Sequence, residues 1–360
     1  MDEIERKEPE EVDSVLSCET ESLKSDSAAL ESLQKNGSVE PVFSCEPAPT
    51  LRTLFDQSIE QLRLVCAEDA TREAELLLCY VLGKDRAYLY AYGEIPVDEE
   101  AYCLLSSMLA ERLTGKPLQY ILGTTEFMGL TLEVNPAVLI PRQDTELLAE
   151  TAIEMIFHRS VNMSEAGSSN FAFGIPHFDV LDLCTGSGAV AIAIAKLAYA
   201  AIVTATDISQ EALDIATRNA AAAELSRPIF FVQGDLFAAL PPGSKFDMIV
   251  SNPPYIASAV VESLETNVRD HEPRIALDGG ADGLDFIKRI LAEAPFHLKP
   301  GGQLLMEIGY DQGPRALALA TAAQPSDAPN PQTPTQTLFA KARILKDLGG
   351  NDRVLVASME

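Results

Sequence analysis

The stretch FDVLDLCTGSGAVAIAIAKLAYAAIVTATD, residues 178–207, decides the fold class. Two apolar runs, 178–184 and 201–207, stand on either side of a glycine-containing turn and an apolar segment at 188–198. A nearly continuous apolar run is typical of a strand that is buried on both faces, as in parallel sheets. The pattern therefore predicts a strand, a tight turn, a helix and a second strand parallel to the first.

The same alternation continues toward the C-terminus. We expect helices at 209–224 and 283–298, strands at 229–235, 246–251 and 301–309, and a closing hairpin at 343–358 that turns at residues 349–352. Interleaved apolar strands and helices indicate an α/β domain of the Rossmann-like kind. Its sheet should be mostly parallel and doubly wound, with an antiparallel edge hairpin.

The N-terminal part reads differently. Residues 1–50 hold 13 acidic and four basic side chains with few large apolar ones, which predicts a disordered acidic arm. Residues 51–122 show helical periodicity and predict a small helical domain, and the alternating segment 123–142 predicts a β-hairpin linker. The α/β domain then spans 143–360, with flexible loops expected at 160–177 and 324–337.

Composition narrows the class of function. The net charge of −27 argues against a protein that grips nucleic acid through its phosphates and suits a protein partner better. No apolar run reaches membrane-spanning length, and the acidic N-terminus resembles no secretory or organellar leader, so we expect a cytoplasmic protein without a membrane contact. The six cysteines and four histidines show no metal-ligand spacing, so we expect reduced thiols and no metal site.

The turn after the first strand has the form of a phosphate-binding or cofactor-binding loop. Gly186, Gly188 and Ala191 satisfy the spacing G-x-G-x-x-A, and Asp207 ends the next strand, where a carboxylate can accept both hydroxyls of a ribose. Such glycines could also serve strand–helix packing alone. The loop by itself does not distinguish a nicotinamide dinucleotide from S-adenosylmethionine.

Two further acids favour S-adenosylmethionine. Asp182 stands at the end of the first strand, where it can face a cationic methionine group but would repel a pyrophosphate. Asp235 ends the third strand and could accept from an adenine amino group, with Leu236 covering the adenine face. An ordinary cap of the strand end is the other reading of Asp235.

The segment FDMIVSNPPY, residues 246–255, brings a stiff polar corner to the end of a buried strand. An amide nitrogen is a poor nucleophile, so its lone pair must be aimed at the methyl carbon by fixed hydrogen-bond acceptors. The side-chain oxygen of Asn252 and the carbonyl of Pro253 can hold both amide protons, and Pro253 and Pro254 stiffen the corner. Tyr255 can pack on a flat substrate group. No general base is needed before attack, because the methylated nitrogen loses its proton readily.

Several motifs in order resemble the release-factor glutamine N5-methyltransferases: IPRQDTELL, DLCTGSGAVAIAIA, TATDISQEAL, FDMIVSNPPYI, HEPRIALDGGADGLDFIKRI and LKPGGQLLMEIGYDQG. The resemblance implies a Rossmann-like methyltransferase fold and transfer of a methyl group from S-adenosylmethionine to the glutamine of the Gly-Gly-Gln loop of peptide-chain release factors. It also implies that the helical domain docks the release factor. Carried over by motif, the cofactor contacts are Cys184, Thr185, Gly186, Ser187, Gly188, Asp207, Leu236 and Asn252, and the corner Asn252–Tyr255 holds the glutamine amide.

Two positions depart from the family pattern, and one residue is ambiguous. Cys184 stands where glycine is frequent, and Leu236 stands where some members carry an aromatic residue, which would weaken adenine stacking. Arg142 either approaches the substrate or is a surface arginine beside a helix start. Residues 272–283 should form a substrate-facing flap whose glycines allow positive φ.

Other functions fit these residues less well. An adenine N6-methyltransferase acting on DNA or RNA shares the Asn-Pro-Pro-Tyr chemistry but needs base flipping and a basic groove. A nicotinamide-dependent oxidoreductase leaves the Asn252–Tyr255 segment unexplained, and a silent adaptor has no need of it. We therefore expect a monomeric enzyme that acts on a protein.

Overall fold

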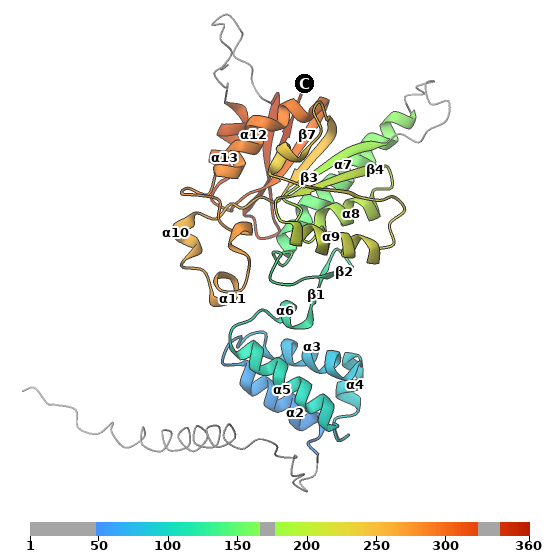
Figure 1. The fold of residues 1–360 in the computed structure, drawn as a ribbon, viewed down its shortest axis with the longest axis vertical. Coiled ribbons are helices and arrows are strands. Elements are labelled where there is room, and N and C mark those ends of the chain that lie inside the picture. Colours follow the sequence, from blue (N-terminus) through green and yellow to red (C-terminus); the bar gives the residue numbers. More distant parts are fainter. Residues whose placement is uncertain (1–47, 166–176, 323–338) are drawn as a thin grey trace, which may run out of the picture. The chain divides into compact units, whose positions relative to one another are not determined.

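The computed structural model describes residues 48–165, 177–322 and 339–360. In these residues a seven-stranded sheet has the order β5-β4-β3-β6-β7-β9-β8 (Figure 1). The strands are β3 (Phe178–Leu183), β4 (Ala201–Asp207), β5 (Phe230–Gln233), β6 (Phe246–Ser251), β7 (Leu298–Glu307), β8 (Lys341–Lys346) and β9 (Asp352–Ser358). The pairs from β5 to β7 are parallel, whereas β9 runs antiparallel to both β7 and β8. The predicted parallel sheet with an antiparallel edge hairpin is confirmed.

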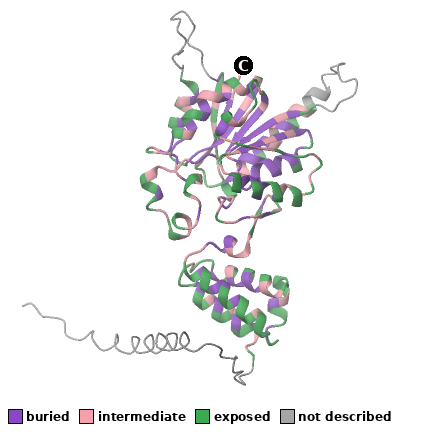
Figure 2. Cartoon of the chain, in the orientation of Figure 1, coloured by how far each residue is buried: buried purple, intermediate pink, exposed green. Residues whose placement is uncertain are grey.

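Each face of the sheet has its own hydrophobic core, because neighbouring residues of a strand point to opposite faces. Val180 belongs to one core, and Leu181 and Leu183 belong to the other. The strands of the sheet are mostly buried and purple in Figure 2. Helices α7 (Glu146–Glu165) and α8 (Ala189–Leu197) pack on the first face, and α12 (Asp285–His297) and α13 (Gly313–Thr321) pack on the second. Helix α9 (Gln210–Ala222) contacts β4 and β5. Burial on both faces explains why the strands read as apolar runs rather than as alternating ones.

The order of the strands creates a crevice. From β3 the chain adds β4 and β5 on one side, and it then returns to add β6 and β7 on the other side of β3. The connections leaving β3 and β6 therefore diverge at the carboxyl ends of two neighbouring strands, which is where open α/β sheets bind ligands. Leu183 pairs with Ser251 in this register, so the residues that follow them start the two walls of the crevice.

The helical segment has an independent core. Helices α2 (Leu51–Leu62), α3 (Ala70–Leu82), α4 (Arg86–Ala91), α5 (Glu99–Leu113) and α6 (Leu118–Leu122) enclose a separate apolar cluster. Asp85 and Asp98 accept hydrogen bonds from the first turns of α4 and α5, as helix caps do. Arg112 and Glu73 form a buried ion pair at 2.7 Å that joins α5 to α3. The predicted hairpin follows as β1 (Thr124–Phe127) and β2 (Leu130–Glu133).

Two predicted boundaries were wrong. Helix α7 continues to Glu165, so residues 160–165, which were expected to be loop, are helical. The last turns contain few apolar residues, so apolar periodicity does not detect this end of the helix. Strand β7 begins at Leu298 rather than 301, because α12 ends at His297 without an intervening loop.

Some expectations lie outside the described residues, namely those for 1–47, 166–176 and 323–338. Within the described ranges, no helix is long and apolar enough to cross a membrane. The same part of the chain holds no group of three or more His, Cys, Asp or Glu side chains placed to bind a metal ion.

Candidate active site

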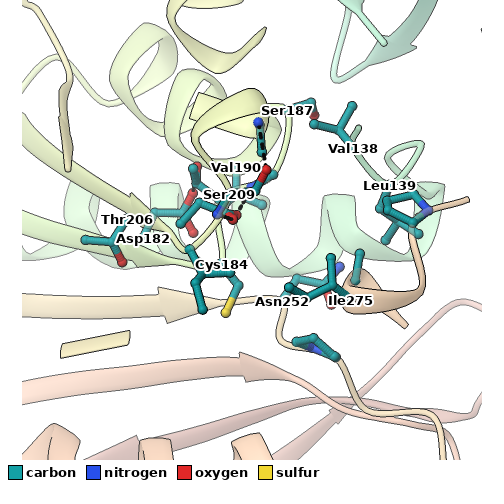
Figure 3. Close-up of a pocket in the computed structure, with 18 of the residues that line it drawn as sticks. Val138, Leu139, Asp182, Cys184, Ser187, Val190, Thr206, Ser209, Asn252 and Ile275 are labelled. Carbon is teal, nitrogen blue, oxygen red and sulfur yellow. Dashed lines mark hydrogen bonds between the residues drawn. The ribbon is translucent and has the colours of Figure 1, made fainter. Parts of the chain in front are cut away.

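A cavity of about 220 Å³ opens at the carboxyl ends of β3 and β6, which is room for a ligand far larger than a water molecule (Figure 3). Cys184 and Asn252, the residues that follow the paired strand ends, both line it. Asp182, Asp207 and Asp235 line it as well, one from each of three neighbouring strand ends. The structure thus brings the predicted cofactor loop and the predicted corner into one cavity.

The loop after β3 needs residues with positive φ. Gly186 and Gly188 have φ of 55° and 83°, and Gly188 is the N-cap of α8. A Cβ at Gly188 would lie 3.0 Å from Ala216 Cβ, so this glycine also permits the close approach of α9. Cys184 has φ of 60°, a backbone conformation that favours glycine. The glycine expected from the family pattern would adopt this conformation without strain.

Asp182 is buried at the end of β3. Its Oδ2 accepts a hydrogen bond from Thr185 Oγ1 at 2.6 Å, and its exposed fraction is 1%. Burial raises the pKa of Asp182 to about 7, and the bond from Thr185 opposes that rise. A positive charge bound nearby would stabilise the carboxylate form.

Asp207 organises the loop from the end of β4. Its Oδ2 accepts from the Gly186 backbone N–H and its Oδ1 accepts from the Ser209 N–H, both at 2.9 Å. Burial raises the pKa of this carboxyl too, while the backbone hydrogen bonds lower it. A carboxylate has about four lone-pair sites, so two bonds to the backbone leave capacity for ligand hydroxyls.

The third strand end carries Asp235 and Leu236. Asp235 Oδ2 accepts from Arg289 Nη2 at 2.7 Å, and Arg289 is the only Lys or Arg among the cavity-lining residues that the structure describes. Leu236 is buried with φ of 49°, lines the cavity and belongs to the second core. In the structure, Asp235 is paired with Arg289. The contact of Asp235 with adenine stays a prediction.

The corner after β6 is held from two sides. Asn252 Nδ2 donates to Thr145 Oγ1 at 3.1 Å, and Asn252 and Pro254 line the cavity. Tyr255 does not line it: its ring packs against the second core, and its hydroxyl donates to Glu307 Oε1 at 3.0 Å. The predicted contact of Tyr255 with a flat substrate group remains a prediction.

Comparisons with known proteins fit this geometry. Residues 53–123 match the family model of the PrmC N-terminal domain, and residues 165–268 match that of the Methyltransferase small domain. A release factor glutamine methyltransferase of Koribacter versatilis is 42% identical over 261 residues, which cover 72% of this chain and 87% of that protein. The chain belongs to the release factor glutamine methyltransferase family.

Two other relatives share this name. The protein of Geobacter sulfurreducens is 39% identical and covers 85% of this chain and 95% of its own length. That of Xylella fastidiosa (strain 9a5c) is 42% identical, covering 79% of this chain and 91% of its own. Membership in the release factor glutamine methyltransferase family makes the chain a methyltransferase, and the matched N-terminal model coincides with the predicted helical domain.

Arg142 lies away from the cavity lining. Its guanidinium pairs with the buried carboxyl of Glu272, whose side chain is 1% exposed. Burial raises the pKa of Glu272, and Arg142 lowers it. The pair ties the segment before α7 to the segment that contributes Pro273 and Ile275 to the cavity. Direct contact of Arg142 with substrate therefore stays a prediction, whereas its link to Glu272 is in the structure.

Residues 279–283 pack against the corner, whereas Pro273, Ile275 and Ala276 of the same segment line the cavity. That residues 272–283 form a substrate-facing flap stays a prediction. Gly280 and Gly283 have φ of 90° and 72°, which is the positive φ expected for this segment. A Cβ at Gly279 would lie 2.8 Å from both Pro254 O and Tyr255 Cα. Glycine here lets one backbone pass directly against another, which holds the corner in place.

Sequence reasoning missed three residues of this site. Thr145 was expected only as part of a helix start, Glu307 only as part of a strand, and Arg289 only as part of a helix. Glu307 did carry a signal, because an acid within the apolar run LLMEI is unusual in a buried strand. Contacts with Asn252, Tyr255 and Asp235 depend on the fold and have no local sequence signal.

Proposed function

We propose that the protein transfers a methyl group from S-adenosylmethionine to the side-chain amide nitrogen of the glutamine in the Gly-Gly-Gln motif of peptide-chain release factors. The observation that carries the proposal is the shared cavity. The stiff corner at Asn252 and the acidic loops at Asp182 and Asp207 line the same space. A transferase needs its nucleophile and its methyl donor in one site.

The cavity residues suit a cationic ligand that carries an adenosine. Three carboxylates and one arginine line it, and that arginine is already paired with Asp235. A dinucleotide would bring a pyrophosphate against the carboxylate of Asp182, which disfavours it. Thr206 Oγ1 is a buried hydroxyl without a partner in the described residues, so the cavity also has a polar group to spare.

The residues that would hold the cofactor follow from their positions. We assign Asp207 to the ribose hydroxyls, Asp182 to the cationic methionine group, and Asp235 with Leu236 to the adenine. The loop Cys184–Gly188 would supply backbone contacts at the start of α8. Bound there, S-adenosylmethionine supplies an electrophilic methyl group on a sulfonium sulfur.

The chain's own contribution is orientation. The Oδ1 atom of Asn252 and the carbonyl of Pro253 would accept the two hydrogens of the substrate amide. The Pro253 carbonyl is part of a backbone that Pro253 and Pro254 stiffen, and the Asn252 side chain projects from the same corner, so little entropy is lost when the two acceptors engage the substrate. Holding both N–H groups in fixed directions aims the nitrogen lone pair and favours the transition state over the free amide.

Cys184 needs to stay inert in this site. A thiolate is a far better nucleophile than an amide and would compete for the methyl group. Burial and the neighbouring charges of Asp207 and Asp182 raise the pKa of the Cys184 thiol well above its usual range. The thiol therefore stays protonated at neutral pH.

We further propose that the helical domain docks the release factor. Its described surface exposes several large apolar and aromatic side chains, including Leu76, Tyr80, Tyr92, Tyr102 and Leu104. Aromatic residues are enriched in protein interfaces. A protein substrate also suits the net charge of −27 better than a nucleic acid does.

A labelling experiment tests the function. The purified chain is incubated with methyl-labelled S-adenosylmethionine and, in parallel, with a release factor, its Gln→Ala variant in the Gly-Gly-Gln loop, and adenine-rich DNA. We expect label on the wild-type factor alone, located on the glutamine amide by mass spectrometry. Label on the DNA, or equal label on the Gln→Ala variant, would contradict the proposal.

A further inference from the structure

A chain of polar side chains runs from Asn252 through Thr145, which also lines the cavity, to the buried end of β7. Asn252 Nδ2 donates to Thr145 Oγ1 at 3.1 Å, and Thr145 is 3% exposed. Beyond it lies Glu307, the last residue of β7, which is 1% exposed. The Thr145 hydroxyl is close enough to this carboxyl to lower its pKa.

The two oxygens of Glu307 have different partners. Oε1 accepts from the Tyr255 hydroxyl at 3.0 Å. Oε2 is buried and makes no hydrogen bond in the described part of the chain, so it is the oxygen still open to the Thr145 hydroxyl. Leaving a buried carboxylate oxygen without a hydrogen-bond donor costs free energy. The hydroxyl proton of Thr145 is therefore best directed toward Oε2 of Glu307.

The direction of these hydrogen bonds decides which way the amide of Asn252 faces. An ionised carboxylate only accepts, so the single hydroxyl proton of Thr145 goes to Glu307. The oxygen of Thr145 is then left to accept, and the group of Asn252 that can donate to it is the NH₂. The amide oxygen Oδ1 is consequently free to accept from a substrate.

We propose that Thr145 and Glu307 are positioning residues that lock the side-chain amide of Asn252 with its oxygen toward the substrate glutamine. The inference rests on the proposed function, because it assigns Asn252 Oδ1 as an acceptor for the substrate amide. Without the lock, the Asn252 amide can turn over by rotation about its last bond. The NH₂ group of Asn252 then faces the NH₂ group of the substrate glutamine, and the substrate amide loses one of its two hydrogen-bond acceptors.

Two charged groups, Arg353 and Asp144, and two hydroxyls act on Glu307, besides its burial. Arg353 of β9 and the hydroxyls of Thr145 and Tyr255 favour its ionised form, whereas burial and Asp144 favour the protonated form. The net effect is that the pKa of Glu307 is raised above its ordinary value. Arg353 is itself held by Asp144 and Asp347, each at 3.0 Å.

The raised pKa gives the lock a pH dependence with a definite sign. When Glu307 takes up a proton, it can donate to Thr145, and the Thr145 proton is released toward Asn252. In that arrangement Thr145 donates to Asn252, which turns the amide oxygen of Asn252 toward Thr145 and its NH₂ group toward the substrate. Turnover at saturating cofactor and substrate should therefore fall as the pH drops through the pKa of Glu307.

The test uses the full-length chain and four variants. Thr145→Val removes the hydroxyl at nearly constant shape, and Thr145→Ser keeps it. Glu307→Gln replaces the acceptor-only carboxylate with an amide that can donate. Thr151→Val removes another buried hydroxyl, from α7, outside the cavity lining, and serves as the matched control. For each we measure kcat, KM for the release factor, and the Kd for S-adenosylmethionine by calorimetry.

We expect Thr145→Val and Glu307→Gln to lower kcat by about 10- to 100-fold, as the loss of one oriented hydrogen bond in the transition state does. The cofactor Kd should stay within about threefold, since neither residue is assigned to the cofactor. Thr145→Ser should restore most of kcat, and Thr151→Val should match the wild type. The acidic limb of the kcat profile should disappear in Glu307→Gln.

Each outcome decides something. If the wild type is active and Thr145→Val retains its kcat, the inference is overturned while the proposed function stands. If Thr145→Ser is as impaired as Thr145→Val, the hydroxyl is not the active feature and the inference is likewise overturned. A wild-type chain that leaves the release factor unlabelled overturns the proposed function and the inference together. Should Glu307→Gln not fold, the pair of Thr145 variants decides alone.

Discussion

At the scale of single residues, we expect the site to orient the substrate amide with hydrogen-bond acceptors rather than to remove its proton with a general base. Asn252 presents an amide whose nitrogen donates to Thr145, and the described cavity lining contains no histidine or lysine. This suits a substrate amide that need not lose a proton before its nitrogen attacks. The important property of such a residue is its direction, which packing and hydrogen bonds set.

Replacing Asn252 with alanine should therefore separate turnover from binding. We expect Asn252→Ala to lower kcat by about 10²- to 10³-fold, the range found when one oriented donor or acceptor is removed from a transition-state site. The Kd for S-adenosylmethionine should change by only a few fold. Steady-state kinetics and calorimetry measure the two. Equal losses in both would mean that Asn252 mainly holds the cofactor.

The titration of Asp182 should appear in cofactor binding. Its pKa of about 7 in the ligand-free protein lies above the ordinary value of 3.8, so the folded state holds a proton that the unfolded chain has released. Stability of the ligand-free protein should accordingly decrease as pH rises from about 4 to about 7.

A bound cation favours the ionised carboxylate, so binding of S-adenosylmethionine should expel this proton. We expect the Kd to rise as pH falls below about 7, by up to about tenfold per pH unit, and to level off above it. Calorimetry between pH 5.5 and 8 measures the slope. In Asp182→Asn the affinity should be weaker and its slope smaller; an unchanged slope would assign the proton to another group, such as Asp207, whose pKa is also raised.

At the scale of elements, the corner after β6 is shaped by the segment packed behind it. Gly279 N–H donates to Ile256 O at 2.8 Å, and Gln312 Nε2 donates to Tyr255 O at the same distance. Gln312 also donates to Gly283 O at 3.1 Å. The corner is therefore rigid because of its prolines and because α13 and the 279–283 segment hold its backbone.

Adding one methyl group to this packing should disturb the chemistry. We expect Gly279→Ala to push the backbone of Pro254 and Tyr255, since its Cβ would lie 2.8 Å from both. A shift of a few tenths of an ångström to one ångström misplaces the acceptors, so kcat should drop by about tenfold to a hundredfold with little change in cofactor affinity.

The matched control is Gly349→Ala, in the turn between β8 and β9. The Cβ added there would meet only side-chain atoms of Asn351 and Asp347. This variant should keep the wild-type kcat. If Gly279→Ala is equally active, the corner is not held in the way described.

At the scale of the whole molecule, docking and chemistry are assigned to different parts of the chain. The helices α2–α6 have their own core, and the cavity is lined by residues 137–289. Substitutions on the exposed face of α3 should then affect KM for the release factor and leave kcat and cofactor affinity unchanged.

Leu76→Ser with Tyr80→Ser tests this division, since the two residues lie one turn apart on α3 and are 41% and 54% exposed. We expect KM for the release factor to rise several-fold, corresponding to about 1–2 kcal/mol of lost contact. Phe157→Ser on α7 removes a similarly exposed side chain from the catalytic part and should leave KM unchanged. A KM that stays at its wild-type value in the double variant would place the docking surface elsewhere.

Most of the architecture could be predicted from the sequence, because the strands are apolar throughout and the glycine turn follows the first of them. The same holds for the cavity acids, since Asp182 and Asp207 stand at strand ends, where a parallel sheet collects them. The Asn252 corner could be predicted from its prolines. The end of α7 could not, because its polar last turns have no apolar periodicity.

The supporting contacts could not be predicted, since they join residues far apart in the chain. Asn252 and Thr145 are 107 positions apart, and Arg289 and Asp235 are 54 apart. Only the packing of α7, β6, β7 and α12 brings such pairs together. Sequence patterns identify residues that could do chemistry, whereas the residues that orient them depend on the fold.

A crystal structure of the chain with S-adenosylhomocysteine and a Gly-Gly-Gln peptide of a release factor tests the central claim most directly. The account predicts that the glutamine amide nitrogen donates to Asn252 Oδ1 and to the Pro253 carbonyl, with the remaining side of the nitrogen turned toward the cofactor sulfur. A glutamine amide bound away from this corner, or an Asn252 amide that presents its NH₂ to the peptide, would contradict it.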